Sequence, residues 1–412
     1  MNLREAESYL LDLELFGMRF GLHRMHRLMD VLGMPQRSFA SIHVVGSNGK
    51  SSTARMIAAI LERHGIATGT YTSPHLTSFA ERIEVGELPL VDDAFGAAVE
   101  RVAQAAALIE DTFEEGERIT QFEALTAAGY SEFARRRVEV GVIEAGLGGR
   151  LDATNVLPSR VQVLTNVDLE HTRWLGSSIA EIAAEKLDVV RGHGILVVGE
   201  LHTDAEAVAV RVAGERGTRL VHAPSTAEAP EQALGRFQRR NFAVARAAAE
   251  AFLGELDSGS VRRAADEVEI AGRMEIVAED PLVILDAAHN PAGAAALAES
   301  LPDVVGPRRP VVGALGMLDD KDASGILGAL RGSLDQIVFT CSMHPRAVPP
   351  AELIAKCEEI GGPPAEGVAE PRAAVARARE LAGRDGAVVV AGSIYLVADL
   401  VREEGAVRAS AL

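Results

Sequence analysis

The residues best able to do chemistry form a glycine-rich turn at 46–52, which reads Gly-Ser-Asn-Gly-Lys-Ser-Ser and follows the apolar run 42–45. Glycines let the backbone curl so that its N–H groups point at an anion. Lys50 adds a positive charge, and Ser51 offers a hydroxyl to Mg²⁺. The helical apolar spacing of residues 53–61 would aim a helix N-terminus at the same point. Only G-x-x-G-K-S of the longer phosphate-loop pattern is present. A tight turn before a helix, with no bound phosphate, therefore remains an alternative interpretation.

Lysine usage draws attention to a few positions. The chain has four lysines (Lys50, Lys186, Lys321 and Lys356) against 37 arginines. Lysine is a compact charge that can lose its proton and react, which a guanidinium cannot do. Lys186, beside Glu185 in a helical run, is therefore a candidate reactive residue. A surface lysine paired with Glu185 or Glu181 is the alternative.

Four further segments place polar side chains after apolar strands or near them. Glu144 ends a strand and enters a glycine-rich stretch, where a metal ligand is expected, since ligand groups gather at the carboxyl ends of parallel strands. His171 follows another strand and is a candidate metal contact or a loop histidine. Asp286 ends a third strand and suits a ribose hydroxyl, and Arg273 suits a phosphate. A helix-capping aspartate and a surface arginine remain the alternatives for this last pair.

The elements that must position these residues alternate between short apolar runs and alanine-rich helical segments, which predicts parallel sheets covered by helices. The expected fold class is α/β, with a P-loop-type, mostly parallel sheet domain over 1–272 and a smaller Rossmann-like α/β domain over 273–412. The expected strands are 42–45, 140–144, 161–165, 194–198, 282–286, 310–314, 336–340 and 387–391. The expected helices include 94–110, 122–136, 179–190, 241–253 and 292–300, and 223–235 is expected to be a surface loop.

Composition narrows the class of protein. A net charge of −18 argues against a nucleic-acid partner, which would need a cationic face. Two cysteines make neither a disulfide framework nor a zinc site. The N-terminus lacks the order of a signal peptide, and no apolar run reaches the length of a membrane span. We therefore expect a cytoplasmic protein with no membrane partner.

Taken together, the ordered motifs resemble the folylpolyglutamate synthase and dihydrofolate synthase family, within the Mur-type ATP-dependent amide ligases. The resemblance runs nearly end to end, which makes it far more specific than any one motif. It rests on the phosphate loop and on segments 16–22, 71–76, 81–83, 120–123, 144–155, 165–172, 186, 238–241, 272–273, 286–291, 320–322 and 392–396.

The resemblance implies roles residue by residue. ATP would be held by Ser47, Asn48, Gly49, Lys50, Ser51, Asn241, Arg273 and Asp286. Mg²⁺ would be held by Ser51, Ser73, Glu144 and His171, with Lys186 as a carbamate holding a second ion. The wall for the pterin-bearing substrate would be formed by Met18, Arg19, Phe20, Thr120, Gln121, Phe122, Glu123, Leu151, Asp152 and Ala153. Lys50, Lys186, Glu144, His171 and His289 would be catalytic, with His289 orienting phosphate or substrate.

The chain departs from the family pattern beside the reactive lysine. The residue before His171 is Glu170 instead of the usual aspartate, and Leu187 and Asp188 replace the usual Ala-Gly pair after Lys186. Asp188 therefore puts a carboxylate two residues from Lys186.

The implied reaction joins L-glutamate to a folate or dihydropteroate carboxylate through an acyl phosphate, with ATP and Mg²⁺ and with a monomeric enzyme. Two alternatives remain. One is a Mur-type ligase acting on another carboxylate, although only 45 residues precede the phosphate loop, too few for the UDP-binding domain of a cell-wall ligase. The other is a P-loop ATPase or switch that makes no bond.

Overall fold

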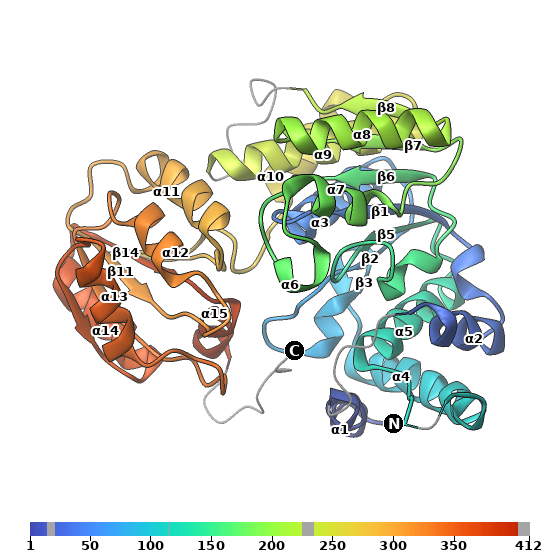
Figure 1. Cartoon of the computed structure of the whole chain (residues 1–412), viewed down its shortest axis with the longest axis horizontal. Helices are drawn as coiled ribbons and strands as arrows, with labels where there is room; N and C mark the ends of the chain where they lie inside the picture. The colour runs from blue at the N-terminus through green and yellow to red at the C-terminus, as the bar shows by residue number, and fades with distance from the viewer. Residues whose placement is uncertain (15–20, 115, 225–234, 403–412) are drawn as a thin grey trace. The chain divides into compact units, whose positions relative to one another are not determined.

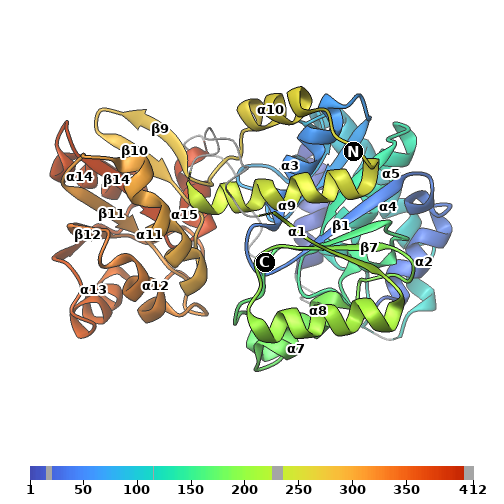
Figure 2. The same cartoon turned by 90° about the horizontal axis from the view of Figure 1, so that it is seen from above.

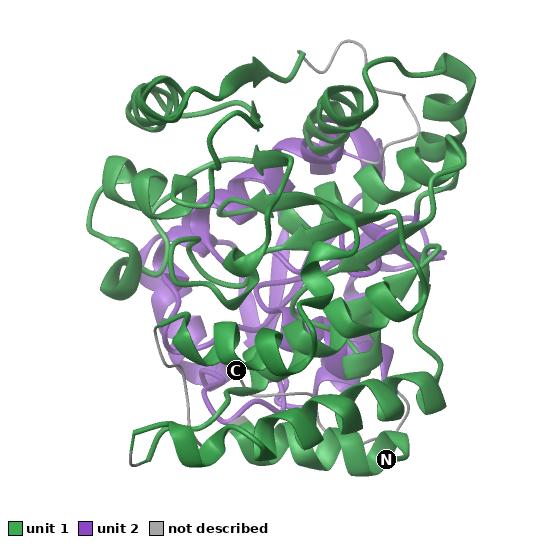
Figure 3. Cartoon of the chain, turned by 90° about the vertical axis from the view of Figure 1, so that its right-hand side faces the viewer, with its two compact units in different colours: residues 1–232, 240–268, 412 green, residues 233–239, 269–411 purple. Residues whose placement is uncertain are grey.

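The computed structural model describes residues 1–14, 21–114, 116–224 and 235–402. The chain divides into two compact units, shown in green and purple in Figure 3. The described residues up to 224 and those from 240 to 268 form the first unit; residues 235–239 and 269–402 form the second. The expected domain boundary lay between 272 and 273. Among the described residues the chain passes from one unit to the other between 239 and 240 and again between 268 and 269.

The first unit is built on a mostly parallel sheet. Among its described residues, eight strands lie in the order β4 (Leu88–Pro89), β3 (Ile83–Val85), β2 (Thr68–Tyr71), β5 (Val140–Glu144), β1 (Ala40–Val45), β6 (Val161–Leu164), β7 (Ile195–Val198) and β8 (Arg219–His222). Only the β2–β3 and β3–β4 pairings are antiparallel. β1, β2, β5 and β6 are almost wholly buried, as expected of parallel strands that helices cover on both faces.

Helices cover this sheet on both sides. The helices of this unit are α1 (Leu3–Glu14), α2 (His23–Val31), α3 (Lys50–Arg63), α4 (Asp92–Ala107), α5 (Gln121–Arg135), α6 (Thr172–Leu175), α7 (Ile179–Leu187), α8 (Thr203–Arg216), α9 (Arg236–Leu253) and α10 (Ser258–Glu267) (Figure 1). The first four residues of α9, 236–239, belong to the second unit. Figure 2 shows β1 and β7 running between α9 on one side and α7 and α8 on the other.

The second unit repeats this architecture on a smaller scale. In its described part the strand order is β13 (Ala365–Gly367), β12 (Gln336–Phe339), β11 (Val311–Leu315), β14 (Ala387–Ala391), β10 (Leu282–Leu285) and β9 (Glu275–Glu279). All pairs are parallel except β9 with β10. The helices are α11 (Pro291–Val305), α12 (Ala323–Leu330), α13 (Pro350–Glu359), α14 (Pro371–Ala382) and α15 (Ile394–Val401).

The predicted α/β class is confirmed, and each of the eight expected strands is found within a residue or two of its expected ends. The five expected helices correspond to α4, α5, α7, α9 and α11; α9 begins at Arg236, five residues before its expected start. Most of the expected loop at 223–235 falls outside the described residues. In the part of the chain that the structure describes, no helix combines the length and apolar character needed to span a bilayer.

Candidate functional site

Strand register brings three polar loops of the first unit to one edge of the sheet. Val44 of β1 pairs with Glu144 of β5, and Val45 pairs with Leu164 of β6. These strands are parallel, so their carboxyl ends meet at the same edge, where open α/β sheets bind ligands. The phosphate loop, the glycine-rich stretch after Glu144 and the segment 165–171 are therefore neighbours.

The two glycines of the phosphate loop have structural reasons to be glycine. Gly46 has φ 152°, and a Cβ there would lie 1.9 Å from Oγ1 of Thr165. Gly49 has φ 78°, and a Cβ there would lie 2.4 Å from Oδ1 of Asn241. Only glycine adopts such a backbone and leaves this space. The predicted nucleotide contact Asn241 thus lies over the phosphate loop, although it is almost 200 residues away in sequence.

The Lys50 side chain folds back along the same loop. Its Nζ donates to the carbonyl oxygens of Gly46 at 3.0 Å and Ser47 at 3.2 Å. The charge therefore sits inside the loop and at the start of α3, where the helix N-terminus also favours an anion.

Asn166 and Asp168 join the phosphate loop to the segment after β6. Asn48 donates two hydrogen bonds to this segment. Its backbone N donates to Oδ1 of Asn166 at 2.8 Å, and its side-chain Nδ2 donates to Oδ2 of Asp168 at 3.1 Å. The backbone N of Asp168 donates to Oγ of Ser47 at 3.0 Å. Burial raises the pKa of Asp168, and the Asn48 hydrogen bond opposes that shift. Neither residue was assigned a role from the sequence, although both follow directly after a predicted strand.

Glu144 binds two of the residues predicted to hold a metal with it. Its Oε1 accepts a hydrogen bond from Oγ of Ser51 at 3.0 Å, and its Oε2 accepts one from the backbone N of Ser73 at 2.9 Å. Ser51 Oγ is also 3.4 Å from the Ser73 carbonyl oxygen. Glu144 is buried, so a carboxylate, a hydroxyl and a carbonyl converge in one place. Such oxygen ligands suit Mg²⁺.

His171 lies on the segment after β6, next to Glu170. It is exposed, has φ 45°, and precedes α6. Over residues 1–14, 21–114, 116–224 and 235–402, no three His, Cys, Asp or Glu side chains gather in a way that could hold a metal ion. The role of His171 as a metal ligand therefore stays a prediction.

Lys186 is buried, which makes the surface-lysine alternative wrong. Its Nζ lies 2.7 Å from Oε1 of Glu170 and donates to the Gly46 carbonyl oxygen at 2.9 Å. Burial lowers the pKa of Lys186, and the charge of Glu170 opposes that effect. Burial raises the pKa of Glu170, but the nearby lysines outweigh it and hold that pKa below its ordinary value. Lys186 thus links the phosphate loop to the segment that carries His171.

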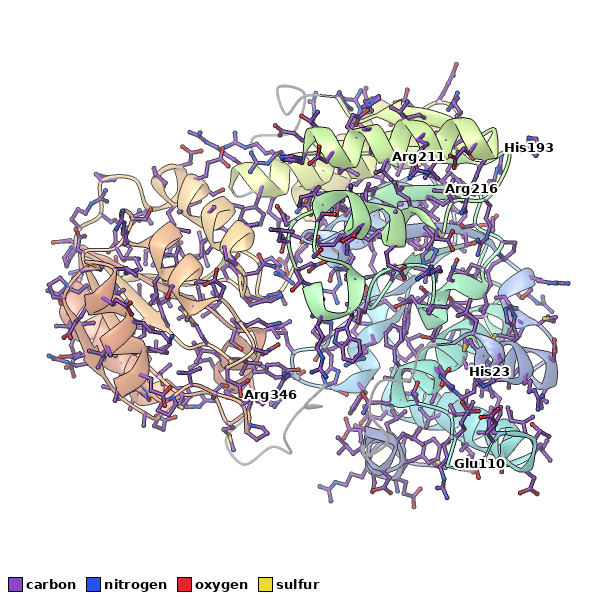
Figure 4. The ribbon with its side chains drawn as sticks, in the orientation of Figure 1. His23, Glu110, His193, Arg211, Arg216 and Arg346 are labelled. Atoms are coloured by element: carbon purple, nitrogen blue, oxygen red, sulfur yellow. The ribbon has the colours of Figure 1, made fainter. Side chains whose placement is uncertain are left out.

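Asp188 does not compete for Lys186. Its carboxylate pairs with Arg216, the last residue of α8 (Figure 4). The carboxylate that departs from the family pattern is therefore neutralised by an arginine of the first unit and not by Lys186.

Thr120 and Glu123 of the predicted substrate wall build the start of α5. They form a capping box, in which each side chain accepts a hydrogen bond from the other residue's backbone N–H. Glu123 also forms a buried ion pair with Arg24 of α2, Nε to Oε1 3.1 Å. Gln121 donates from Nε2 to the Leu10 carbonyl oxygen at 2.9 Å. Arg24 was not predicted as a site residue, because no local sequence pattern distinguishes it.

Phe122 and Leu151 remain partly accessible beside this framework. A Cβ on Gly146 would lie 2.5 Å from the Phe122 ring, so glycine there makes room for that ring. Leu151 is 37% exposed. Asp152 and Ala153, by contrast, are buried. The predicted wall residues Met18, Arg19 and Phe20 lie outside the described residues.

In the second unit, Asp286 follows β10 and is buried. Its Oδ2 accepts a hydrogen bond from the backbone N of Met274 and its Oδ1 one from Ala288, at 2.9 and 2.8 Å. Burial raises the pKa of Asp286, and the charge of nearby Arg273 opposes that shift. The predicted pair Arg273 and Asp286 is thus brought together. His289 Nδ1 lies 2.9 Å from the Ala287 carbonyl oxygen.

Comparison with known proteins gives the same pattern over both units. Residues 44–229 match the Mur ligase middle domain, and residues 272–394 match the Mur ligase, glutamate ligase domain. The chain is 36% identical over 382 residues to a dihydrofolate synthase/folylpolyglutamate synthase of Mycobacterium tuberculosis, covering 83% of this chain and 78% of that protein. It is 34% identical over 429 residues to a probable bifunctional folylpolyglutamate synthase/dihydropteroate synthase of Haloferax volcanii. That match covers 97% of this chain but 50% of the relative, so the chain spans about half the relative's length.

Solved structures are similar over nearly the whole chain. Mycobacterium tuberculosis folylpolyglutamate synthase complexed with ADP has a TM-score of 0.89 at 33% identity, covering 97% of this chain and 99% of that one. E. coli FolC in complex with DHPP and ADP has a TM-score of 0.86 at 29% identity, covering 97% of both chains. A Yersinia pestis bifunctional synthase complexed with AMPPNP and Mn ion has a TM-score of 0.85 at 28% identity, again covering 97% of both.

Proposed function

Because the chain belongs to the folylpolyglutamate synthase/dihydrofolate synthase family of Mur ligases, we propose that it is an ATP-dependent, ADP-forming ligase that joins L-glutamate to a folate or dihydropteroate carboxylate. One observation supports this most strongly. The phosphate loop with Lys50 and the Glu144–Ser51–Ser73 group occupy the same sheet edge. An enzyme that activates an acid with ATP needs cation and metal groups side by side.

The chemical problem is charge. The substrate carboxylate must attack the γ-phosphate of ATP, so two anions approach one another and negative charge builds on the transferring phosphoryl group. The charge of Lys50 and the positive end of α3, which starts at Lys50, would counter this. Ser47, Asn48 and Gly49 are proposed to contact the phosphates as well. The backbone N–H groups of Ser47 and Asn48 donate to Asn166 in the structure, so they would have to release Asn166 to bind a phosphate. L-glutamate's amine then attacks the acyl phosphate, the amide bond forms, and inorganic phosphate leaves.

Ser51, Ser73, Glu144 and His171 would hold Mg²⁺. The oxygen-rich character of the first three fits that ion. Bound there, Mg²⁺ would neutralise charge on the phosphate oxygens and orient them.

We also propose that Lys186 becomes a carbamate. Its amine would add CO₂ and release a proton, which turns a cation into an anion suited to a second metal ion. Its lowered pKa supports this, because burial favours the neutral amine that reacts. In the present arrangement Lys186 binds Glu170, so the change requires this ion pair to open.

Arg273 and Asp286 are proposed as nucleotide contacts. Asn241 is proposed as a nucleotide contact beside the phosphate loop, and His289 is proposed to orient phosphate or substrate. The Asp286 carboxylate suits a ribose hydroxyl and the Arg273 guanidinium suits a phosphate. The pterin-bearing substrate would lie against the partly accessible side chains of Phe122 and Leu151. The other proposed wall residues are Met18, Arg19, Phe20, Thr120, Gln121, Glu123, Asp152 and Ala153.

We further propose that the enzyme is a cytoplasmic monomer whose partners are its small-molecule substrates, with no nucleic acid or membrane among them. The acidic composition supports the absence of a nucleic-acid partner, since a net charge of −18 disfavours polyanions.

The decisive experiment measures ADP release by the purified chain with dihydropteroate and with tetrahydrofolate, each with and without L-glutamate. We expect ADP release only when a pterin substrate and L-glutamate are both present, with a product heavier by one glutamate residue. Equal ADP release without either would favour an ATPase or switch. Release that needs a different acid would favour another Mur-type ligase.

A further inference from the structure

A chain of three buried polar residues runs from the centre of the first unit's sheet to the predicted substrate wall. His43 lies on β1 and is 1% exposed. Its Nε2 is 2.8 Å from Oγ1 of Thr154, and Thr154 Oγ1 hydrogen-bonds to Oδ1 of Asp152. Neither His43 nor Thr154 was assigned a role from the sequence, and neither takes part in the phosphate loop's hydrogen bonds described above.

The direction of these hydrogen bonds follows from the atoms available. Both Asp152 oxygens accept backbone N–H groups, Oδ2 from Leu147 at 2.8 Å and Oδ1 from Thr154 at 3.0 Å, so Asp152 acts as an acceptor. Thr154 has one hydroxyl hydrogen, which goes to Asp152. His43 must therefore donate from Nε2 to Thr154.

The histidine is suited to be a fixed, neutral donor. Burial lowers the pKa of His43 to about 3, and the positive charge of Arg191 acts in the same direction. The ring therefore stays uncharged across the physiological range, with its tautomer set by the Thr154 hydroxyl. Burial raises the pKa of Asp152, whereas the hydrogen bonds from Thr154, Leu147 and Gly146 lower it.

Asp152 in turn holds the glycine-rich loop. Its hydrogen bond to Leu147 ties the short 3-10 helix Ala153–Val156 to the loop that follows Glu144. The Phe122 ring packs directly against Gly146 of that loop. Tyr130 of α5 donates from its hydroxyl to the Thr154 carbonyl oxygen at 3.1 Å, which fixes the same turn from another side.

We propose that His43 and Thr154 are positioning residues for the pterin-bearing substrate: they hold the Asp152 carboxylate and the loop it anchors in the geometry that forms the substrate wall. This inference rests on the proposed function. Removing the His43 donor or the Thr154 hydroxyl leaves a buried polar group without its partner and loosens the wall, while the phosphate loop keeps all of its own hydrogen bonds.

The test compares four variants in kinetics and in direct binding. His43→Leu and Thr154→Val remove the two side-chain hydrogen bonds. His43→Gln places an amide nitrogen close to Nε2, and Thr154→Ser keeps the hydroxyl. The matched control is Thr68→Val. Thr68 is another buried threonine whose Oγ1 donates to a carboxylate, Oε1 of Glu62, at 2.6 Å. It is the first residue of β2 and therefore lies at the end of that strand opposite the site. KM for the pterin substrate, KM for ATP and kcat are measured, and the Kd of the pterin substrate is measured by titration calorimetry.

We expect His43→Leu and Thr154→Val to raise KM and Kd for the pterin substrate about tenfold. KM for ATP should stay within about twofold of wild type. His43→Gln and Thr154→Ser should restore most of the affinity, and Thr68→Val should leave it unchanged.

Unchanged pterin affinity in His43→Leu and Thr154→Val would overturn the inference, as would an equal loss in Thr68→Val. If Thr154→Val does not fold, the comparison of His43→Leu with His43→Gln decides the question by the same criteria. A wild-type chain that binds no pterin substrate would instead overturn the proposed function. The wild-type titration therefore separates failure of the two proposals.

Discussion

Lys186 reaches the phosphate loop through Gly46: its Nζ donates to the Gly46 carbonyl oxygen at 2.9 Å while lying 2.7 Å from the Glu170 carboxylate. One buried ammonium therefore connects the loop proposed to hold ATP with the segment that carries His171. The backbone of Lys186 also packs closely against the loop that follows Glu144, since a Cβ on Gly149 would lie 2.5 Å from the Lys186 carbonyl oxygen. Any change at Lys186 is expected to affect three loops of the site.

Lys186→Ala should be largely inactive, and short carboxylates such as acetate should restore part of its activity. The substitution removes the proposed carbamate, and a small carboxylate can fill the space and supply the missing negative charge. ADP release is measured against carboxylate concentration.

Lys186→Arg separates carbamate formation from the ion pair. Arginine keeps a positive charge for Glu170, but its guanidinium does not add CO₂. We expect thermal stability close to wild type together with the low activity of Lys186→Ala. Full activity of Lys186→Ala without any added carboxylate would rule out the carbamate.

Lys50→Ala should reduce ATP turnover at least about 100-fold, because it removes the cation that lies inside the phosphate loop. Lys356→Ala is the matched control, since Lys356 is one of the few other lysines, lies on α13 of the second unit and has no proposed role. Steady-state ADP release is compared for the two variants. Near-normal turnover of Lys50→Ala would remove the phosphate-loop assignment.

Glu144→Gln should raise the Mg²⁺ concentration needed for half-maximal ADP release about tenfold, because an amide is a weaker ligand than a carboxylate for a hard cation. The Mg²⁺ titration is run beside Glu139→Gln. Glu139 precedes the same strand at its other end, where it accepts a hydrogen bond from Ala67 at 2.9 Å. An identical Mg²⁺ requirement in both variants would exclude Glu144 as a ligand.

Sequence patterns predicted the central strands because these strands are continuous apolar runs, buried on both faces. β2 was missed because its sequence, Thr-Gly-Thr-Tyr, has no such run. Its burial comes from tertiary packing: a Cβ on Gly69 would lie 2.5 Å from the Phe133 ring, so the strand's glycine makes room for a side chain of α5. A contact over that distance in sequence leaves no local pattern.

In the site, too, residues that follow a local sequence pattern were predicted, and residues whose contacts are distant in sequence were not. Glu144 and the phosphate loop could be predicted because each follows a strand directly. The partner of Lys186 could not, because the sequence offered only the acids of the same helical run, Glu185 and Glu181, as candidates. In the structure Lys186 shares the buried face of α7 with Ile182, which directs it towards Glu170 instead. Arg24 was missed for a related reason, since its partner Glu123 is 99 residues away.

The final prediction concerns stability and acid. Glu132 of α5 is buried and pairs with three arginines, Arg101, Arg135 and Arg136, at 2.7–2.8 Å. Burial raises the pKa of Glu132, but the hydrogen bonds from Arg135 and Arg136 outweigh it and lower that pKa from 4.5 to about 2. The folded protein therefore holds the charged form more tightly than the unfolded chain does, which stabilises the fold above pH 4.5. The contribution is lost as pH falls from 4.5 towards 2.

Glu132→Gln should accordingly lower the free energy of unfolding by about 2 kcal/mol at pH 7, and the difference from wild type should shrink steadily below pH 4.5. Urea denaturation of both proteins at pH 7, 4 and 3 measures this difference. Glu215→Gln is the control, because Glu215 forms an exposed pair with Arg211 on α8 and should change the free energy of unfolding by less than about 0.5 kcal/mol at any of these pH values. A Glu132→Gln difference that stays constant from pH 7 to pH 3 would show that the charge of Glu132 does not stabilise the fold.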